Sequence, residues 1–237
     1  MVRKTVKIRI ADLNVQIDTQ SNYIKSKCSD YACDFEVEDI TVRVEKSEIE
    51  REKSLVPNYP DDYYEFVCAY RKICLEMPFF DRMIMHGAVI KAGERGYAFM
   101  AKSGVGKTTH ILNWKKSFPD MVEIINGDKP ILAFDGKKVI AYGTPWCGKE
   151  GFNINSKVGL DAICLLKRGN ENRIQKIDKT MAINFVFGQI LLPKTEEAAL
   201  KTLELASRLL ENVPVYELYC TQDKESAQVA KKMLDMA

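Results

Sequence analysis

The sequence predicts an α/β fold built on a mixed β-sheet, and three observations lead to this prediction. Apolar, strand-like runs alternate with stretches of helical spacing through most of the 237 residues. Asp135-Gly136 separates two of these runs, which is a strong signal for a short hairpin and hence for antiparallel pairing. A glycine-rich segment at 103–108 follows one apolar run and opens a helical one.

Composition indicates a globular chain with one sizeable domain, or one domain with a small appendage. Hydrophobic residues make up 46% and charged residues 29%, and the net charge is +2. This balance gives no case for a nucleic-acid or membrane partner, and no signal peptide or membrane-spanning stretch is evident. Cys28 and Cys33 have no second pair or histidine nearby, so we expect no metal there, reduced thiols and a cytoplasmic location.

The N-terminal quarter is expected to be a small β-rich extension over residues 1–55. Residues 6–10 and 41–44 alternate between apolar and polar, as strands do, while 46–53 is a run of mixed charge that favours a solvated face or linker. A helix is predicted at about 61–77, because core-type side chains recur there at helical spacing before Pro78: Phe66, Tyr70, Ile73, Cys74 and Met77.

The rest of the chain is expected to alternate strands and helices. Met181 to Leu192 should form a buried helix, and Thr195 should cap the next helix, with Glu196 and Glu197 in its first turn. The strands expected lie at 85–91, 97–101, 121–127, 130–134, 138–142, 162–166 and 213–219, and the helices at 107–117, 181–192, 195–211 and 224–236.

The segment Ala101-Lys-Ser-Gly-Val-Gly-Lys-Thr108 is typical of a phosphate-binding loop between a strand and a helix, although its first position is Ala rather than Gly. Backbone amides and the helix N-terminus would surround a phosphate. Lys107 would reach the β- and γ-phosphates, and Thr108 would bind Mg²⁺. We therefore expect a nucleoside triphosphate to bind Ser103, Gly104, Val105, Gly106, Lys107, Thr108 and Thr109.

Hairpin registers place two further residues near this loop. If residue 91 pairs with 97, His86 faces Lys102 at the mouth of the loop, either beside the γ-phosphate or as a structural histidine. Asp128 follows the strand 121–127, a common position for a catalytic or Mg²⁺-binding carboxylate, although an Asp there can also be a plain turn residue. The ends of the two strands are expected to face one crevice.

The second hairpin brings the loop 144–151 to the same rim, with Asp128 opposite Gly143. Its residues Trp146, Lys149 and Glu150 suit an acceptor-binding loop, although Trp146 could equally anchor a local core. His110 is expected to be a helix-face residue, and Asn170 and Asn172 are given no chemistry.

Four segments together resemble the HPr serine kinase-like family, which shares its nucleotide-binding core with ATP-dependent phosphoenolpyruvate carboxykinases. They are His86-Gly87, Ser103–Thr108, Gly127-Asp128 and Tyr142–Trp146. The resemblance spans about 80–220 and implies a P-loop kinase-like domain over 56–237. It also implies that His86 and Asp128 flank the γ-phosphate, that Asp128 is the general base and helps hold Mg²⁺, and that Lys107 and Thr108 serve the nucleotide.

Two departures from the family pattern refine this expectation. Asn126-Gly127-Asp128 stands where bifunctional HPr kinase/phosphorylases have paired aspartates, and Thr144-Pro-Trp146 replaces their later arginine- and glycine-containing segment. The chain thus resembles the small stand-alone branch, some members of which tailor peptides. Neither phosphorylation of HPr itself nor phosphorolysis is carried over.

The function expected is a Mg²⁺- and ATP-dependent kinase that phosphorylates a serine or threonine hydroxyl on a small protein or peptide. A kinase for a small hydroxylated metabolite is one alternative, and a non-catalytic nucleotide-binding regulator is another. A carboxykinase is less favoured, because no residues can be assigned to oxaloacetate. The acceptor and the oligomeric state stay open, with a homo-oligomer among the options. The sequence contains no Asn-Lys-x-Asp segment of the kind that recognises guanine.

Overall fold

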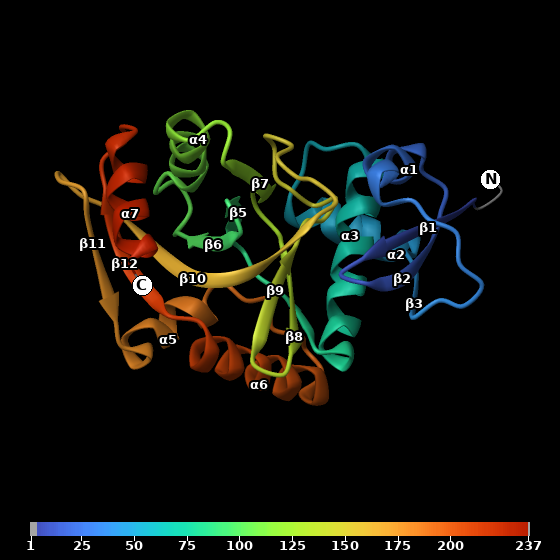
Figure 1. Cartoon of the computed structure of the whole chain (residues 1–237). Helices are drawn as coiled ribbons and strands as arrows, with labels where there is room; N and C mark the ends of the chain where they lie inside the picture. The colour runs from blue at the N-terminus through green and yellow to red at the C-terminus, as the bar shows by residue number, and fades with distance from the viewer. Residues whose placement is uncertain (1–3, 237) are drawn as a thin grey trace.

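The computed structural model describes residues 4–236, which form two β-sheets and the helices that cover them (Figure 1). The smaller sheet lies at one end of the molecule, and the larger one runs through its centre. The α/β class and the mixed sheet expected from the sequence are confirmed. No helix in this part of the chain combines the length and apolar character needed to cross a bilayer.

The N-terminal sheet has the order β1-β2-β3, with β1 (Lys4–Ile10) and β2 (Leu13–Thr19) antiparallel and β3 (Ile40–Arg43) parallel to β2. Alternate residues of β2 are buried, as the sequence alternation predicts. The helices beside this sheet are α1 (Asn22–Lys27), the short η1 (Ser29–Tyr31), α2 (Lys46–Leu55) and α3 (Asp61–Glu76). The short η2 (Met77–Phe80) follows α3 and leads into the large sheet.

The charged run 46–53, interpreted from sequence as a solvated face or linker, lies in the helix α2, of which only Glu52 is buried, so it is a largely solvated helix face and not a linker. Its N-terminus carries a capping box, in which the Glu48 side chain accepts a hydrogen bond from the Glu45 backbone at 2.8 Å. Glu48 and Glu52 then bind Lys72 and Arg71 of α3, and Glu52 is buried. The mixed charges therefore fasten one helix to another.

The N-terminal sheet and α3 share one apolar core with β4 (Arg82–Ile84), β8 (Ile131–Asp135) and Trp146. All five residues expected in the core stripe of α3 are buried, which confirms that part of the sequence analysis. The division of the chain at residue 55 stays a prediction.

The described strands of the large sheet follow the order β4-β8-β9-β10-β6-β5-β7, with β12 added to β10 and β11 to β12. The first half of β10 is antiparallel to β9, and its second half is parallel to both β6 and β12. The strands are β4 (Arg82–Ile84), β5 (Ala88–Ala92), β6 (Arg95–Met100), β7 (Val122–Asn126), β8 (Ile131–Asp135), β9 (Lys138–Tyr142), β10 (Lys157–Arg168), β11 (Arg173–Ile177) and β12 (Val215–Cys220).

Two helical layers enclose the large sheet (Figure 1). One apolar core lies between the sheet and α4 (Lys107–Ser117) and α7 (Glu225–Asp235). The other lies between the sheet and α5 (Lys179–Phe187) and α6 (Glu196–Asn212). Trp114, buried completely, anchors α4 to the sheet.

The predicted buried helix at 181–192 is wrong in extent and in burial. The Asp178 side chain caps the Thr180 amide at 2.8 Å and starts α5 earlier, and the helix ends at Phe187. Of this helix only Ala182 and Val186 are buried, whereas Met181 is 67% exposed. No strand was predicted at the position of β11.

Candidate functional site

The glycine-rich loop joins the end of β6 at Met100 to the start of α4 at Lys107, so the strand–loop–helix context expected from the sequence is present. Gly104 and Gly106 have φ of +78° and +118°, a region that side chains strongly disfavour. The loop therefore needs glycine at both positions.

Arg168, at the end of β10, holds this loop from outside. Its Nη2 donates to the Gly104 carbonyl at 2.5 Å, and its Nε donates to the Val105 carbonyl at 3.5 Å. Arg168 was not predicted from the sequence to be part of the site. The feature that could have indicated its role is a basic residue at the end of the strand parallel to β6, and this feature can be recognised only once the strand order is known.

A buried asparagine shapes the turn that presents Asp128. The Asn126 Oδ1 accepts hydrogen bonds from the amides of Asp128 and Lys129 at 2.8 and 2.7 Å. Its Nδ2 donates to the Thr144 carbonyl at 3.1 Å, which ties the turn to the loop 144–151. Asn126 was noted from sequence only as a departure from a family pattern, yet it fixes the backbone of the candidate carboxylate.

His86 and Lys107, both singled out from sequence, meet at Asp128 together with Lys129, which was not. The Asp128 Oδ1 lies 3.2 Å from His86 Nε2 and 3.3 Å from Lys107 Nζ, and Oδ2 lies 3.8 Å from Lys129 Nζ. The strands β6 and β7 are parallel to each other, with β5 between them, so their carboxyl ends lie on one edge. The catalytic roles of Asp128, His86 and Lys107 stay predictions, whereas the proximity of these three side chains is a feature of the fold.

The charges around Asp128 keep it ionised. Burial by itself would raise its pKa, but the hydrogen bond from His86 and the charges of Lys129 and Lys107 lower it to about 2. Burial also lowers the pKa of Lys107, and this effect outweighs the charge of Asp128, which by itself would raise that pKa. The pair therefore holds a carboxylate and a partly buried amine in direct contact.

Both hairpin registers lie close to those used to place these residues. Lys91 pairs with Gly96, one residue from the expected partner. Ile131 pairs with Tyr142, two residues further along than expected, so the register extended beyond the end of β9 at Tyr142 brings Pro145, rather than Gly143, opposite Asp128. The loop 144–151 nevertheless reaches the site, because a Cβ on Gly148 would lie 3.2 Å from the Cβ of Asp128.

The three acceptor-loop residues occupy different surroundings. Trp146 is only 6% exposed, stacks on Phe66 with ring centroids 5.3 Å apart, and donates from Nε1 to the Phe66 carbonyl at 3.3 Å. Its position fits the core-anchor alternative. Lys149 and Glu150 are exposed beyond it.

Of the nucleotide-loop residues, Ser103, Gly104 and Thr109 are exposed, and Thr108 is half-buried. His110, expected to be a helix-face residue, lies on the buried face of α4. It accepts a hydrogen bond from Trp114 Nε1 at 3.0 Å, and burial lowers its pKa to about 3.

The cysteines and acidic residues form no metal centre within residues 4–236. The seven cysteines are unpaired, and burial raises the pKa of Cys28 to about 12. Asn172, to which no chemistry was assigned, accepts a hydrogen bond from the Thr221 amide at 2.9 Å, a structural contact.

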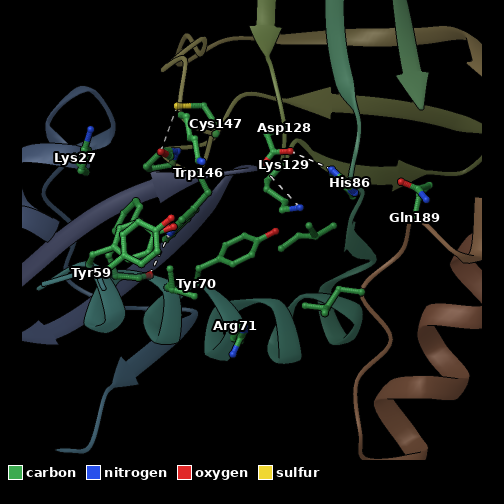
Figure 2. A pocket seen from close by; sticks show the side chains of 18 of the residues that line it. Lys27, Tyr59, Tyr70, Arg71, His86, Asp128, Lys129, Trp146, Cys147 and Gln189 are labelled. Carbon is green, nitrogen blue, oxygen red and sulfur yellow. Dashed lines mark hydrogen bonds and ion pairs between the residues drawn. The ribbon is translucent and has the colours of Figure 1, made fainter. Parts of the chain in front are cut away.

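A pocket of about 680 Å³ opens beside Asp128 and His86, on the side of α3 (Figure 2). Tyr70 and Arg71 of α3 lie across from Asp128 and Lys129, with Gln189 beyond His86 and Trp146 and Cys147 at the other end. None of the loop residues 101–108 lines it, so Asp128 and His86 separate the pocket from the phosphate loop.

Comparison with known proteins leaves the chain without an assigned family. No family model matches it, and no curated protein matches it. Among solved structures it is similar to the HPr(Ser) kinase/phosphatase from Coxiella burnetii, with 8% sequence identity over 65% of this chain and 97% of that one and a TM-score of 0.38. A similarity of this size does not assign a family.

Proposed function

We propose that this chain is a Mg²⁺- and ATP-dependent kinase that transfers the γ-phosphoryl group to a serine or threonine hydroxyl of a small protein or peptide. The observation that carries the proposal is the contact of Lys107, which opens α4 behind the glycine-rich loop, with Asp128, which also accepts from His86. A loop amine, a carboxylate and an imidazole thereby converge where a terminal phosphate would lie.

The nucleotide would be held by the loop between β6 and α4. Amides of residues 103–108 and the positive end of α4 attract phosphate oxygens, and Lys107 adds a full charge. Arg168 holds the carbonyls of Gly104 and Val105 outward, which leaves neighbouring amides free to turn inward. Thr108 and Thr109 follow in the first turn of the helix.

The oxygen donors beside the loop fit Mg²⁺. This ion prefers hard oxygen ligands and is usually held by one or two carboxylates together with phosphate oxygens. Asp128, which contacts the loop lysine, and the hydroxyl of Thr108 would supply the protein ligands. When bound, the ion neutralises charge on the β- and γ-phosphates.

The transfer itself needs one proton acceptor and one source of positive charge. The acceptor hydroxyl gives its proton to Asp128 as its oxygen bonds to the γ-phosphorus, the bond to the bridging β–γ oxygen breaks, and ADP leaves. When Lys107 turns to the phosphates, Asp128 loses one of the cations that lower its pKa and accepts a proton more readily. His86 stabilises the developing charge.

A second candidate, a kinase for a small hydroxylated metabolite, is favoured by the pocket beside Asp128. Its volume of about 680 Å³ lies in the range of sites for small molecules. Turnover with free serine or a simple alcohol, and none with peptides, would select this alternative.

Lys107→Ala tests the proposal most directly. Titration calorimetry with a non-hydrolysable ATP analogue and Mg²⁺ should show binding to the parent chain and a loss of at least ~10-fold in the variant, because a charge-assisted contact to phosphate is removed. Lys116→Ala, at an exposed position on the same helix, is the matched control. Equal affinity in all three proteins would overturn the proposal.

A further inference from the structure

The pocket beside Asp128 is lined by segments of the chain that lie outside the nucleotide loop. Tyr23 and Lys27 come from α1, and Tyr59 and Tyr63 come from the start of α3 and the turn before it. The N-terminal segment therefore contributes directly to the cavity that faces the candidate carboxylate, which gives residues 1–55 a role other than packing.

Aromatic rings dominate one wall of this pocket. Tyr59 and Tyr63 stack with ring centroids 4.5 Å apart, and Tyr23 meets Phe66 edge to face at 5.6 Å. Tyr59 is 38% exposed, so part of this wall is open to a ligand. Such surfaces favour aromatic groups, because ring pairs contribute beyond the area they bury.

The charges that line the pocket are mainly positive. Its lining contains four basic side chains, those of Lys27, Arg71, Lys129 and Lys149, and a single carboxylate, that of Asp128. Arg71 is neutralised by the buried Glu52, and Lys129 lies 3.8 Å from Asp128.

Lys27 and Lys149 remain at the end of the pocket next to Cys147, and neither forms an ion pair within the described residues. Burial raises the pKa of Cys147; the charge of Lys27 opposes this shift and that of Asp128 adds to it, so both charges act on this end of the pocket. Glu150 does not line the pocket. This end suits an anionic group of the acceptor.

We propose that this pocket is the acceptor site and that it selects a short peptide segment in which an acidic residue and an aromatic residue flank the reacting serine or threonine. The aromatic side chain packs against Tyr59 and Tyr63, the acidic one meets Lys27 and Lys149, and the hydroxyl reaches Asp128. This inference rests on the proposed kinase function. The pocket volume suits a few residues of extended chain rather than a folded surface.

Binding of fluorescent peptides, followed by polarisation in low salt, tests the inference without requiring turnover. The probes are octapeptides with a central serine, one with glutamate and phenylalanine beside it, one with lysine for glutamate, and one with alanine for phenylalanine. The first should bind at least ~10-fold more tightly than either of the others, and the acid preference should weaken as salt screens the charges.

The double variant Lys27→Glu/Lys149→Glu should lose the preference for the acidic peptide and gain one for its lysine counterpart. Lys137→Glu, an exposed position at the β8–β9 turn, is the matched control and should behave as the parent chain does. Equal binding of the three peptides, or an unchanged preference in the double variant, would overturn the inference. Tight binding of a free hydroxy acid with weak peptide binding would overturn it as well.

Failure of the proposed function has a different signature. A chain that binds the acidic peptide selectively but neither binds the ATP analogue nor phosphorylates the serine retains this pocket as a peptide site and is not a kinase. A chain that phosphorylates all three peptides equally is a kinase without the selectivity inferred here.

Discussion

Replacing Asp128 with Asn should lower the stability of the chain at neutral pH by about 2 kcal/mol. The carboxylate has a pKa of about 2, below its ordinary value of 3.8, because His86, Lys129 and Lys107 outweigh the effect of burial. Each pKa unit corresponds to roughly 1.4 kcal/mol of preference for the folded state, which gives the stated magnitude. For a chain of this length the expected fall in Tm is about 4–8 °C.

The sign of the pH dependence follows from the lowered pKa. The folded state binds this proton less readily than the unfolded state, whose Asp has a pKa of about 4. The stabilisation is therefore complete above that value and is lost as the pH falls toward the folded-state pKa of about 2. The difference between the parent chain and Asp128→Asn should shrink over the same range.

Urea unfolding of both proteins, from neutral pH down to about pH 3, measures this difference. Asp120→Asn, at an exposed turn position, controls for the loss of a surface carboxylate. The same Asp128→Asn protein should bind the ATP analogue within about tenfold of the parent and transfer phosphate at least ~10²-fold more slowly. A stability loss that stays constant with pH, or no loss at neutral pH, would refute the electrostatic argument, and unchanged turnover would remove Asp128 from the mechanism.

Three further substitutions separate the parts of the site. Arg168→Ala should raise the KM for ATP more than it lowers kcat, because the carbonyl of Gly104 loses its donor; a KM unchanged in steady-state assays would mean that the loop holds its shape alone. Trp146→Ala should cost roughly 3–5 kcal/mol in unfolding experiments, since the ring is buried and stacked on a neighbour; a loss well below 1 kcal/mol would contradict the core-anchor position. Lys149→Ala should raise the KM for an acidic peptide acceptor and leave the KM for ATP unchanged, and the reverse pattern would assign this lysine to the nucleotide.

The sequence was sufficient to predict the features that depend on local patterns. The start of α4 at Lys107 followed from the glycine-rich loop, and the Asp135-Gly136 turn set the β8–β9 hairpin to within two residues. The proximity of His86 to the loop followed from the β5–β6 hairpin, because the register of paired strands fixes which residues lie opposite one another. That of Asp128 followed from its position at the end of β7, whose carboxyl end was expected to face the same crevice as that of β6.

Features that depend on contacts between distant segments were not predictable in this way. The charged run of α2 became interpretable only once Glu52 was found beside Arg71 of α3. Ala182 and Val186 of α5 share a core with residues of α6 while Met181 is exposed, and which face of α5 is buried depends on that distant helix. The aromatic pocket likewise joins α1, α3 and the loop 144–151, three segments with no common sequence pattern.

The two-part pairing of β10 has a consequence for the order in which the chain can assemble during synthesis. The strand that carries the glycine-rich loop, β6, has β5 on one side and the second half of β10 on the other. A nascent chain that stops before residue 157 therefore contains every loop residue but lacks both the neighbouring strand and the Arg168 donor. Long-range parallel pairing of this kind forms slowly, because a long intervening segment must be ordered first. Competence to hold a phosphate should thus arise late, when most of the polypeptide has left the ribosome, and the loop sequence alone should not confer it.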